Sequence, residues 1–306
     1  MTADVVSIAS FNVDLVSRVP RPIARGETLH AAAFEISPGG KGSNAAVAAA
    51  RQAARVAVIA RVGADDFGRM GLELWRAEEI GTEHVEIAAG ETSGVAQILV
   101  YDDGDNSIAV YAGASAGLTA RHAQAARATL EACRVVMASC EVPLAATLEA
   151  FRIARAAGAI TVLNPAPAQP LPDELLVMTD VLTPNETEVP ILAALAGDAP
   201  VDATARTLLG RGARAVLVTL GAAGCVLYRA GLPPQGQIGR RTTVVDTIGA
   251  GDTFTGALAA ALARGEPLPQ AMHWANAAAA LSVAGRGAIG GMPTLEQVRA
   301  LLGQHG

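Results

Sequence analysis

The chain is poor in several residue types, and each shortage narrows what it can be. Aromatic residues make up 3% of its 306 positions, no basic cluster is present and the net charge is −6, so nucleic acid is not an expected partner. No apolar run approaches the roughly 18 residues that a membrane span needs. The first residues also lack the basic start and apolar stretch of a secretion signal, so we expect a cytoplasmic protein without a membrane partner. The three cysteines show no C-x-x-C spacing, which predicts free thiols rather than disulfides or a zinc site.

Lysine is the scarcest charged residue. Lys41 is the only lysine, against 22 arginines. An ammonium group is a compact point charge, whereas a guanidinium group is a planar fork. The composition is equally compatible with a point charge that is required at position 41 and with one lysine left by chance in an arginine-biased chain.

Short runs rich in valine and isoleucine alternate with alanine-rich helical stretches along most of the chain. We expect strands at 5–9, 56–60, 135–138, 160–163, 181–183 and 215–219. We expect helices at 44–54 (capped by Asn44), 144–157, 186–196, 252–263 and 270–284. This alternation is typical of a three-layer α/β/α sandwich with a mostly parallel central sheet. No linker or repeat interrupts it, so residues 1–306 are expected to form a single domain.

Two segments, 13–38 and 93–112, break this rhythm. They contain Val/Ile-rich pieces separated by polar turns, without helices between them. The polar run at 102–106 lies between two apolar runs, which is typical of a hairpin. These segments predict a small antiparallel sheet that covers one edge of the α/β body.

The stretch Asp-Thr-Ile-Gly-Ala-Gly-Asp at 246–252 carries the strongest chemical signal. It follows a strand-like stretch at 242–245 and precedes a helix. Gly249, Ala250 and Gly251 are small residues at a helix start, where bare backbone N–H groups and the helix dipole can receive a phosphate. Asp252 beside them can accept the proton of an attacking hydroxyl, as phosphoryl transfer requires. The alternative is that Asp252 only caps a helix after a glycine turn.

A second glycine-rich stretch, Ser-Pro-Gly-Gly-Lys-Gly-Ser-Asn, covers 37–44. It is not a P-loop, because a glycine follows Lys41 and Glu35 stands where the first P-loop glycine should be. Its glycines allow close approach to the backbone, and Lys41 and Asn44 offer donors to a polyol. A merely flexible turn is the alternative.

Read together, these motifs resemble the ribokinase family of sugar kinases. The resemblance runs from Ser10-Phe11-Asn12-Val13-Asp14 to Gly287-Ala288-Ile289, in family order, through both glycine-rich stretches and the segments 163–168, 184–188 and 219–224. Ser43 replaces a usual alanine and Ala45 a usual glutamine, and these two departures bear on the choice of sugar. The resemblance implies transfer of the γ-phosphoryl group of ATP to a small sugar, with ribose as the first expectation. Deoxyribose, fructose, adenosine or inosine are the alternatives.

The resemblance also implies a role for each matching residue. Asp252 would be the general base, with an anion hole at Gly249, Ala250 and Gly251. The sugar would be held by Asn12, Asp14, Gly40, Lys41, Asn44, Glu141 and Asp252. ATP would be bound by Asn185, Thr219, Gly221, Gly224, Gly251 and Asn276.

Two metal ions are implied in the same way. Glu188 would help to place Mg²⁺, through water, because that ion keeps much of its hydration shell. A monovalent cation, expected to be K⁺, would be held by Asp246, Ile248, Ser282, Gly285, Gly287 and Gly291.

The segments 13–38 and 93–112 match the lid of the family. Such a lid closes over the sugar, with Ala96, Ile98 and Val110 as an apolar wall, and its pairing between two subunits predicts a homodimer.

Three other interpretations compete with the kinase. Residues 285–290 fit the dinucleotide pattern G-x-G-x-x-G, but they follow a helix and no βαβ unit comes after them. Residues 113–117 fit G-x-S-x-G, so Ser115 could belong to a hydrolase, with His273 or His305 as its base. A sugar-binding regulator without turnover is the third interpretation. Asp252 and the anion-hole residues argue against it, because binding alone needs neither.

Overall fold

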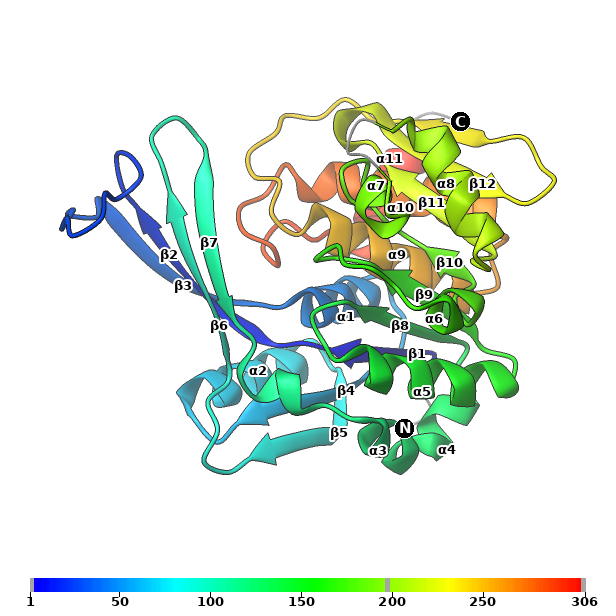
Figure 1. The fold of residues 1–306 in the computed structure, drawn as a ribbon, viewed down its shortest axis with the longest axis horizontal. Coiled ribbons are helices and arrows are strands. Elements are labelled where there is room, and N and C mark those ends of the chain that lie inside the picture. The colour runs from blue at the N-terminus through cyan, green and yellow to red at the C-terminus, as the bar shows by residue number, and fades with distance from the viewer. Residues whose placement is uncertain (1–2, 196–198, 304–306) are drawn as a thin grey trace.

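The computed structural model describes residues 3–195 and 199–303, and they are built around a nine-stranded sheet (Figure 1). Its strand order is β13-β12-β11-β10-β9-β8-β1-β4-β5. The strands from β5 to β11 are parallel, whereas β12 and β13 are antiparallel. Their bounds are β1 Val5–Ala9, β4 Val56–Gly63, β5 Gly81–Ala88, β8 Val135–Ser139, β9 Ile160–Asn164, β10 Val181–Leu182, β11 Ala215–Thr219, β12 Gly224–Arg229 and β13 Gln235–Ile238.

The central strands are apolar at successive positions because both faces of the sheet are covered. Val5 packs into one hydrophobic core, and Val6 points into the other. The first core is covered by α1 Lys41–Arg51, α2 Asp66–Ala77, α9 Ala250–Ala263, α10 Leu268–Ser282 and α11 Leu295–Gly303. The second is covered by α3 Ala120–Ala125, α4 Arg127–Ala132, α5 Leu144–Ala156, α6 Asp173–Val177, α7 Glu188–Leu192 and α8 Val201–Gly210. The predicted three-layer sandwich is therefore confirmed.

A four-stranded sheet, which we call the lid, projects from this body (Figure 1). Its order is β3-β2-β6-β7, with β2 Asn12–Arg18, β3 Ala33–Gly39, β6 Gly94–Val100 and β7 Asn106–Tyr111. These strands lie within the predicted segments. The lid is not wholly antiparallel as predicted, because β2 and β6 pair in parallel.

Several predicted details are wrong. No strand forms at 242–245. Val244 and Val245 are more than half exposed, and the amide of Val245 bonds to the carbonyl of Val283 beyond α10 instead of to a neighbouring strand. The first helix begins at Lys41 with Gly40 at its N-cap, so Asn44 lies inside it. Of the helix expected at 186–196, only α7, Glu188–Leu192, forms within the described residues. Residue 196, the last of the predicted range, lies outside the described part of the chain.

The predictions about the cysteines and about membrane-spanning helices can be compared with the structure. Cys133, Cys140 and Cys225 are buried free thiols, as expected. Across 3–195 and 199–303, no helix has both the length and the apolar character that crossing a membrane demands.

Candidate active site

The residues predicted as an anion receptor, 249–251, lie at the N-terminus of α9. Gly249 is the N-cap residue and has a left-handed backbone, with φ of 77°. A Cβ atom there would lie 2.8 Å from the Cα of Ala288, so glycine is needed both for its conformation and for the space. The amides of Gly251 and Asp252 lie in the first turn, where no intrahelical acceptor is available, whereas the amide of Ala250 donates to the carbonyl of Thr247 at 3.3 Å. This turn can therefore bind an anionic group.

Asp252 lies in that first turn and is only 6% exposed. Its Oδ2 accepts a hydrogen bond from Nδ2 of Asn44 at 2.9 Å, and no side-chain bond caps α9. The helix-cap interpretation of Asp252 is therefore wrong. Burial raises the pKa of Asp252, while the charge of Lys41 and the Asn44 bond oppose the shift. A buried carboxylate with a raised pKa is a better proton acceptor than an exposed one.

Close packing of α1 against α9 brings Asn44 to Asp252. Gly256 makes this possible, because a Cβ atom at that position would collide with the carbonyl oxygen of Ala45. The two departures from the family pattern lie in the same packing region rather than in the cavity described below. Ser43 is buried and accepts a 2.9 Å bond from the Trp75 indole, and Ala45 is also buried.

Lys41 lies at the start of α1 and faces the same site. The negative charge of Asp252 is the largest cause of its raised pKa, and Glu141, Glu188 and Asp14 add to it. Its ammonium group is thus the cation of a cluster of carboxylates. This position favours a required point charge over a lysine retained by chance.

The predicted sugar residues meet between the lid and the ends of β1 and β8. Strand pairing puts Asn12 and Asp14 on the same face of the lid as Ala96, Ile98 and Val110. Ala96 and Ile98 are buried, while Val110 is 59% exposed.

Asp14 has a raised pKa. Burial, followed by the charges of Glu141 and Asp252, raises the pKa of Asp14 to about 6, and Lys41 opposes the shift. Gly39 leaves room for this carboxyl group, because a Cβ atom at Gly39 would lie 2.6 Å from its oxygens.

Glu141 has a positioning contact that the sequence did not predict. Its Oε2 accepts bonds from the hydroxyl of Ser10 at 2.6 Å and from the backbone amide of Lys41 at 2.8 Å. Ser10 was part of a quoted motif, but no signal in the sequence linked it to Glu141, because 131 residues separate them.

A cavity of about 210 Å³ joins Asp252 to the predicted nucleotide residues. Its lining consists of Lys41, Asn164, Ala166, Thr183, Asn185, Glu188, Thr219, Thr247, Gly249, Ala250, Gly251 and Asp252. Four of these, Asn164, Ala166, Thr183 and Thr247, had no predicted role. Asn164 and Thr183 could have been suspected, because they stand at or just after the carboxyl ends of β9 and β10, where ligands of open α/β sheets bind.

Three predicted nucleotide residues do not line this cavity. Gly221 and Gly224 form the turn from β11 to β12, both with positive φ. Asn276 donates a 2.9 Å bond to the carbonyl of Ile238, which ties α10 to β13. All three lie at the β11–β13 side of the sheet, the side on which Thr219 lines the cavity.

The predicted residues for the monovalent cation lie on the loop before α9, at the last residue of α10 (Ser282) and on the loop that follows α10. Asp246 accepts bonds from the amides of Ile248 at 3.0 Å and Gly287 at 2.9 Å. Gly285 and Gly291 touch through their backbones, and a Cβ atom at Gly291 would collide with the Ser282 carbonyl oxygen. The six residues are thus drawn together just before the N-terminus of α9.

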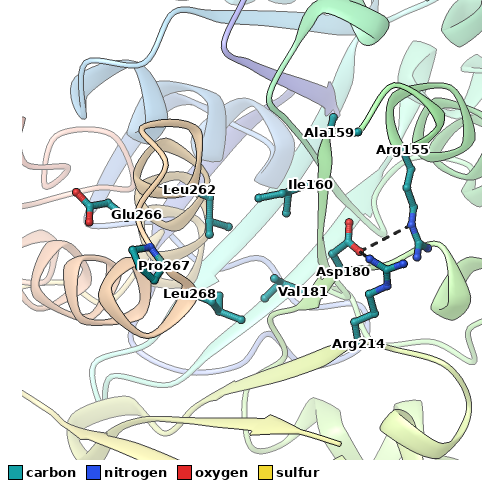
Figure 2. Close-up of a pocket in the computed structure, with 11 residues that line it drawn as sticks. Arg155, Ala159, Ile160, Asp180, Val181, Arg214, Leu262, Glu266, Pro267 and Leu268 are labelled. Atoms are coloured by element: carbon teal, nitrogen blue, oxygen red, sulfur yellow. Dashed lines mark ion pairs between the residues drawn. The ribbon is translucent and has the colours of Figure 1, made fainter.

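A larger cavity of about 550 Å³ lies at the amino ends of β9 and β10, the opposite ends of these strands from Asn164 and Thr183 (Figure 2). Asp180 lies between Arg155, at 3.8 Å, and Arg214, at 3.0 Å. Its Oδ2 accepts a bond from the backbone amide of Thr161. Both arginines are thus paired with Asp180, and the cavity contains no residue of the two glycine-rich stretches, so we assign the chemistry to the smaller cavity, which holds Lys41 and Asp252.

The competing motifs find no support in their surroundings. Ser115 is 1% exposed, and within the described residues its hydroxyl bonds to the backbone of Phe11 and Arg61 rather than to a histidine. His273 lies beside Arg240, and His305 is outside the described part of the chain. Residues 285–290 form turns after α10, with no strand before them.

Comparison with known proteins agrees with this geometry. Residues 2–295 match the family model described as pfkB family carbohydrate kinase. The chain is 36% identical to ribokinase of Haemophilus influenzae, over 96% of this chain and 97% of that protein. It is 34% identical to deoxyribokinase of Salmonella typhi, over 98% of both. The solved structure of Arabidopsis thaliana ribokinase complexed with ribose and ATP is 30% identical and superposes with a TM-score of 0.92 over 99% of both chains. The chain therefore belongs to the pfkB family of carbohydrate kinases.

Proposed function

We propose that this kinase transfers the γ-phosphoryl group of ATP to the primary hydroxyl of D-ribose, giving ribose 5-phosphate and ADP. The observation that carries the proposal is the position of Asp252. It is buried beside the start of α9, accepts a hydrogen bond from Asn44 and interacts electrostatically with the ammonium group of Lys41. The ribokinase similarity along nearly the whole chain supports ribose as the acceptor.

In the proposed step, Asp252 accepts the proton of the sugar hydroxyl. The hydroxyl oxygen forms a bond to the γ-phosphorus while the bond to the β-phosphate oxygen breaks, and ADP leaves with that electron pair. The first-turn amides of α9 and the Lys41 ammonium group stabilise the negative charge on the transferred group. Asn44 holds the Asp252 carboxylate in place through its 2.9 Å bond.

Glu188 is the residue that would hold Mg²⁺ with ATP. It lines the cavity, and its Oε2 accepts a bond from the amide of Asn185 at 2.8 Å. Within the described residues no cluster of three or more His, Cys, Asp or Glu side chains could enclose a metal, which suits an ion held largely by water and phosphate. When bound, Mg²⁺ would neutralise phosphate charge. Thr219 and Asn185 would border the phosphates, with Gly221, Gly224 and Asn276 nearer the adenosine.

Asp14, Asn12, Gly40 and Glu141 would bind the sugar. An ionised carboxylate accepts two hydroxyl hydrogen bonds, and a site built this way rejects analogues that lack those groups. Deoxyribose is the second candidate acceptor, because the deoxyribokinase relative is nearly as similar as the ribokinases.

We further propose activation by K⁺, held by the loops of Asp246, Ile248, Ser282, Gly285, Gly287 and Gly291, and a homodimer formed through the lid. The contacts between the two loops support the first. Exposed apolar side chains on the lid support the second.

ADP release with Mg²⁺-ATP, K⁺ and each of ribose, 2-deoxyribose, fructose, adenosine and inosine tests the proposal. We expect the highest kcat/KM on ribose. Preference for another acceptor would keep the mechanism and replace the substrate. Ribose binding without ADP release would instead indicate a sugar-binding regulator.

A further inference from the structure

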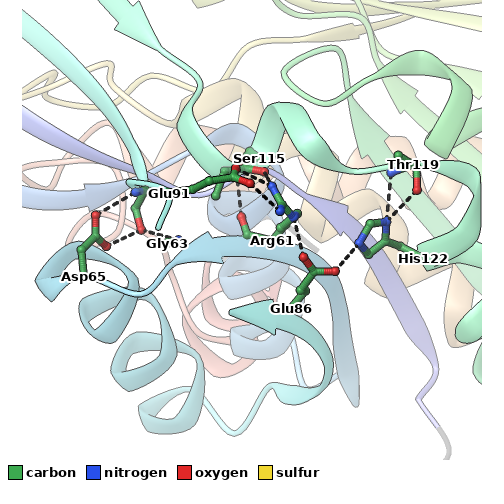
Figure 3. Close-up of polar contacts among 10 residues, drawn as sticks. Arg61, Gly63, Asp65, Glu86, Glu91, Ser115, Thr119 and His122 are labelled. Carbon is green, nitrogen blue, oxygen red and sulfur yellow. Dashed lines mark hydrogen bonds and ion pairs between the residues drawn. The ribbon is translucent and has the colours of Figure 1, made fainter. Parts of the chain in front are cut away.

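Segment 113–117, with the pattern G-x-S-x-G, lies at the root of the lid (Figure 3). Linking residues join the lid to the body at 10–11, 40, 89–93 and 112. Ser115 follows the last of these links. Its buried hydroxyl therefore lies where movement of the lid would be transmitted to the body.

Ser115 ties two of these links together. Its Oγ accepts a bond from the amide of Phe11 at 3.3 Å and donates to the carbonyl of Arg61 on β4 at 3.3 Å. Phe11 directly precedes Asn12, the first residue of β2 and a predicted sugar ligand. The contact thus anchors the entry of the chain into the lid.

Ser93 anchors the link before β6 in a similar way. Its amide donates to Oδ2 of Asp65 at 2.8 Å, and its hydroxyl donates to Oδ1 at 2.7 Å. The amide of Gly63, at the end of β4, donates to the same hydroxyl at 2.9 Å. Asp65 also caps α2 through the amide of Gly68 at 2.8 Å. Burial alone would raise the pKa of Asp65, but the bonds from Ser93 and Gly68 lower it overall, so the anchor remains ionised at neutral pH.

Arg61 connects the two anchors. Its carbonyl receives the Ser115 bond, and its guanidinium group binds both oxygens of Glu91 at 2.6 and 2.7 Å and the carbonyl of Ala114 at 3.2 Å. Glu91 lies in the link before β6, and Ala114 lies beside Ser115. The Arg61 side chain is only 13% exposed, whereas that of Glu91 is 47% exposed, so the guanidinium group is held by the protein while its carboxylate partner remains in contact with solvent.

The anchored residues stand next to a single register pair. Asn12 of β2 pairs with Gly94 of β6, and Phe11 and Ser93 are the residues immediately before them. Holding Phe11 and Ser93 therefore fixes where the two inner lid strands begin, and with them the side chains of Asn12 and Asp14.

We propose that Ser115 and Ser93 are positioning residues for the kinase reaction, which set the sugar-binding face of the lid over Lys41 and Asp252. This inference rests on the proposed function and deepens it. A displacement of about 1 Å at a reacting group can cost two orders of magnitude in rate, so small anchoring groups at a lid root have leverage.

Ser115→Ala and Ser93→Ala test the inference, with Thr204→Val as the matched control. Thr204 is equally buried, and its hydroxyl donates to the carbonyl of Pro200 at 2.8 Å in the helical layer of α8, away from the lid. Each substitution removes the two hydrogen bonds of one hydroxyl, which act on the sugar only through the position of the lid. We therefore expect each serine variant to raise the KM for the accepted sugar about 3- to 10-fold, while the KM for ATP stays within about twofold. Amide hydrogen exchange should accelerate at Phe11 in Ser115→Ala and at Gly63 in Ser93→Ala, because each of these amides loses its hydroxyl acceptor. The control should lower Tm without changing either KM.

Serine variants that lower Tm but keep the parental KM for the sugar would overturn the inference, because the anchors would then only stabilise the fold. If Ser93→Ala does not fold, Ser115→Ala decides alone. A parent protein that phosphorylates no sugar of the panel refutes the proposed function separately. In that case the ribose affinity measured by calorimetry replaces KM. Serine variants with the ribose affinity and the amide hydrogen exchange of the parent would then overturn the inference.

Discussion

Asp252 and Asn44 form the residue pair on which we expect turnover to depend. The Asn44 side-chain amide donates to one oxygen of the buried Asp252 carboxylate and so orients it, and burial raises the pKa of Asp252. We expect Asp252→Asn to lower kcat at least about 100-fold with little change in the KM for ATP, because the substitution removes the base and keeps the shape. Steady-state ADP release measures both. Asp202→Asn, in an exposed pair with Arg206, is the control, and turnover of Asp252→Asn within tenfold of the parent would assign the base elsewhere.

Asp14 should make sugar binding depend on pH. Its pKa of about 6 means that the carboxylate is ionised at neutral pH and becomes protonated as the pH falls. Only the ionised form accepts two hydroxyl bonds, so ribose affinity should fall by up to about tenfold per pH unit below that pKa. Calorimetric titration with ribose at pH values between about 5 and 8 measures this pH dependence of the affinity without relying on turnover. The break should vanish in Asp14→Asn, and a break that persists there would belong to another group.

At the scale of elements, the contact between α1 and α9 decides whether the site exists. Gly256 has no space for a methyl group, because the Ala45 carbonyl of α1 lies against it. Gly256→Ala should lower the free energy of unfolding by about 1–3 kcal/mol through overpacking, and it should also lower kcat by separating Asn44 from Asp252. Urea unfolding gives the first number. Gly210→Ala, in open space at the end of α8, should be neutral or slightly stabilising, and equal behaviour of the two variants would contradict the packing argument.

The two loops beside α9 should make activity depend on the monovalent cation. Asp246 joins them through its bonds to Ile248 and Gly287, and the anion receptor begins immediately afterwards at Gly249. Replacing K⁺ by Na⁺ at constant ionic strength should lower kcat/KM severalfold, because a smaller ion fits the same carbonyl groups less well. Indifference to the exchange would remove the cation from the proposal.

At the scale of the whole molecule, one face of the lid carries large exposed apolar side chains. On the face opposite Asp14, Phe34, Ile36 and Tyr111 are each between 48% and 62% exposed. Exposed apolar patches of this kind mark interaction surfaces. We expect a homodimer of twice the 31.0 kDa chain mass by light scattering. Ile36→Asp should dissociate it, whereas Ile191→Asp on α7, 50% exposed, should not. A monomeric parent would refute the lid interface.

The success of the sequence analysis varied with the range of the interactions involved. The buried strands were predictable because uninterrupted apolar runs reflect burial on both faces. The strand β5 was missed because its sequence, GTEHVEIA, mixes charged and apolar residues at one edge of the sheet. The strand predicted at 242–245 was wrong because Val and Thr propensity cannot supply a neighbour to pair with.

The sequence by itself determined the fold class and the chemical groups of the site. Both depend on short-range patterns: helix starts marked by glycine, apolar periodicity, and motifs in a family order. Only the tertiary structure decided which groups act together. Asn44 and Asp252 are 208 residues apart and meet because α1 and α9 pack closely at Gly256. The pKa of Asp14 and the anchoring role of Ser115 arise in the same way, since burial and contacts between distant segments exist only once the chain has folded.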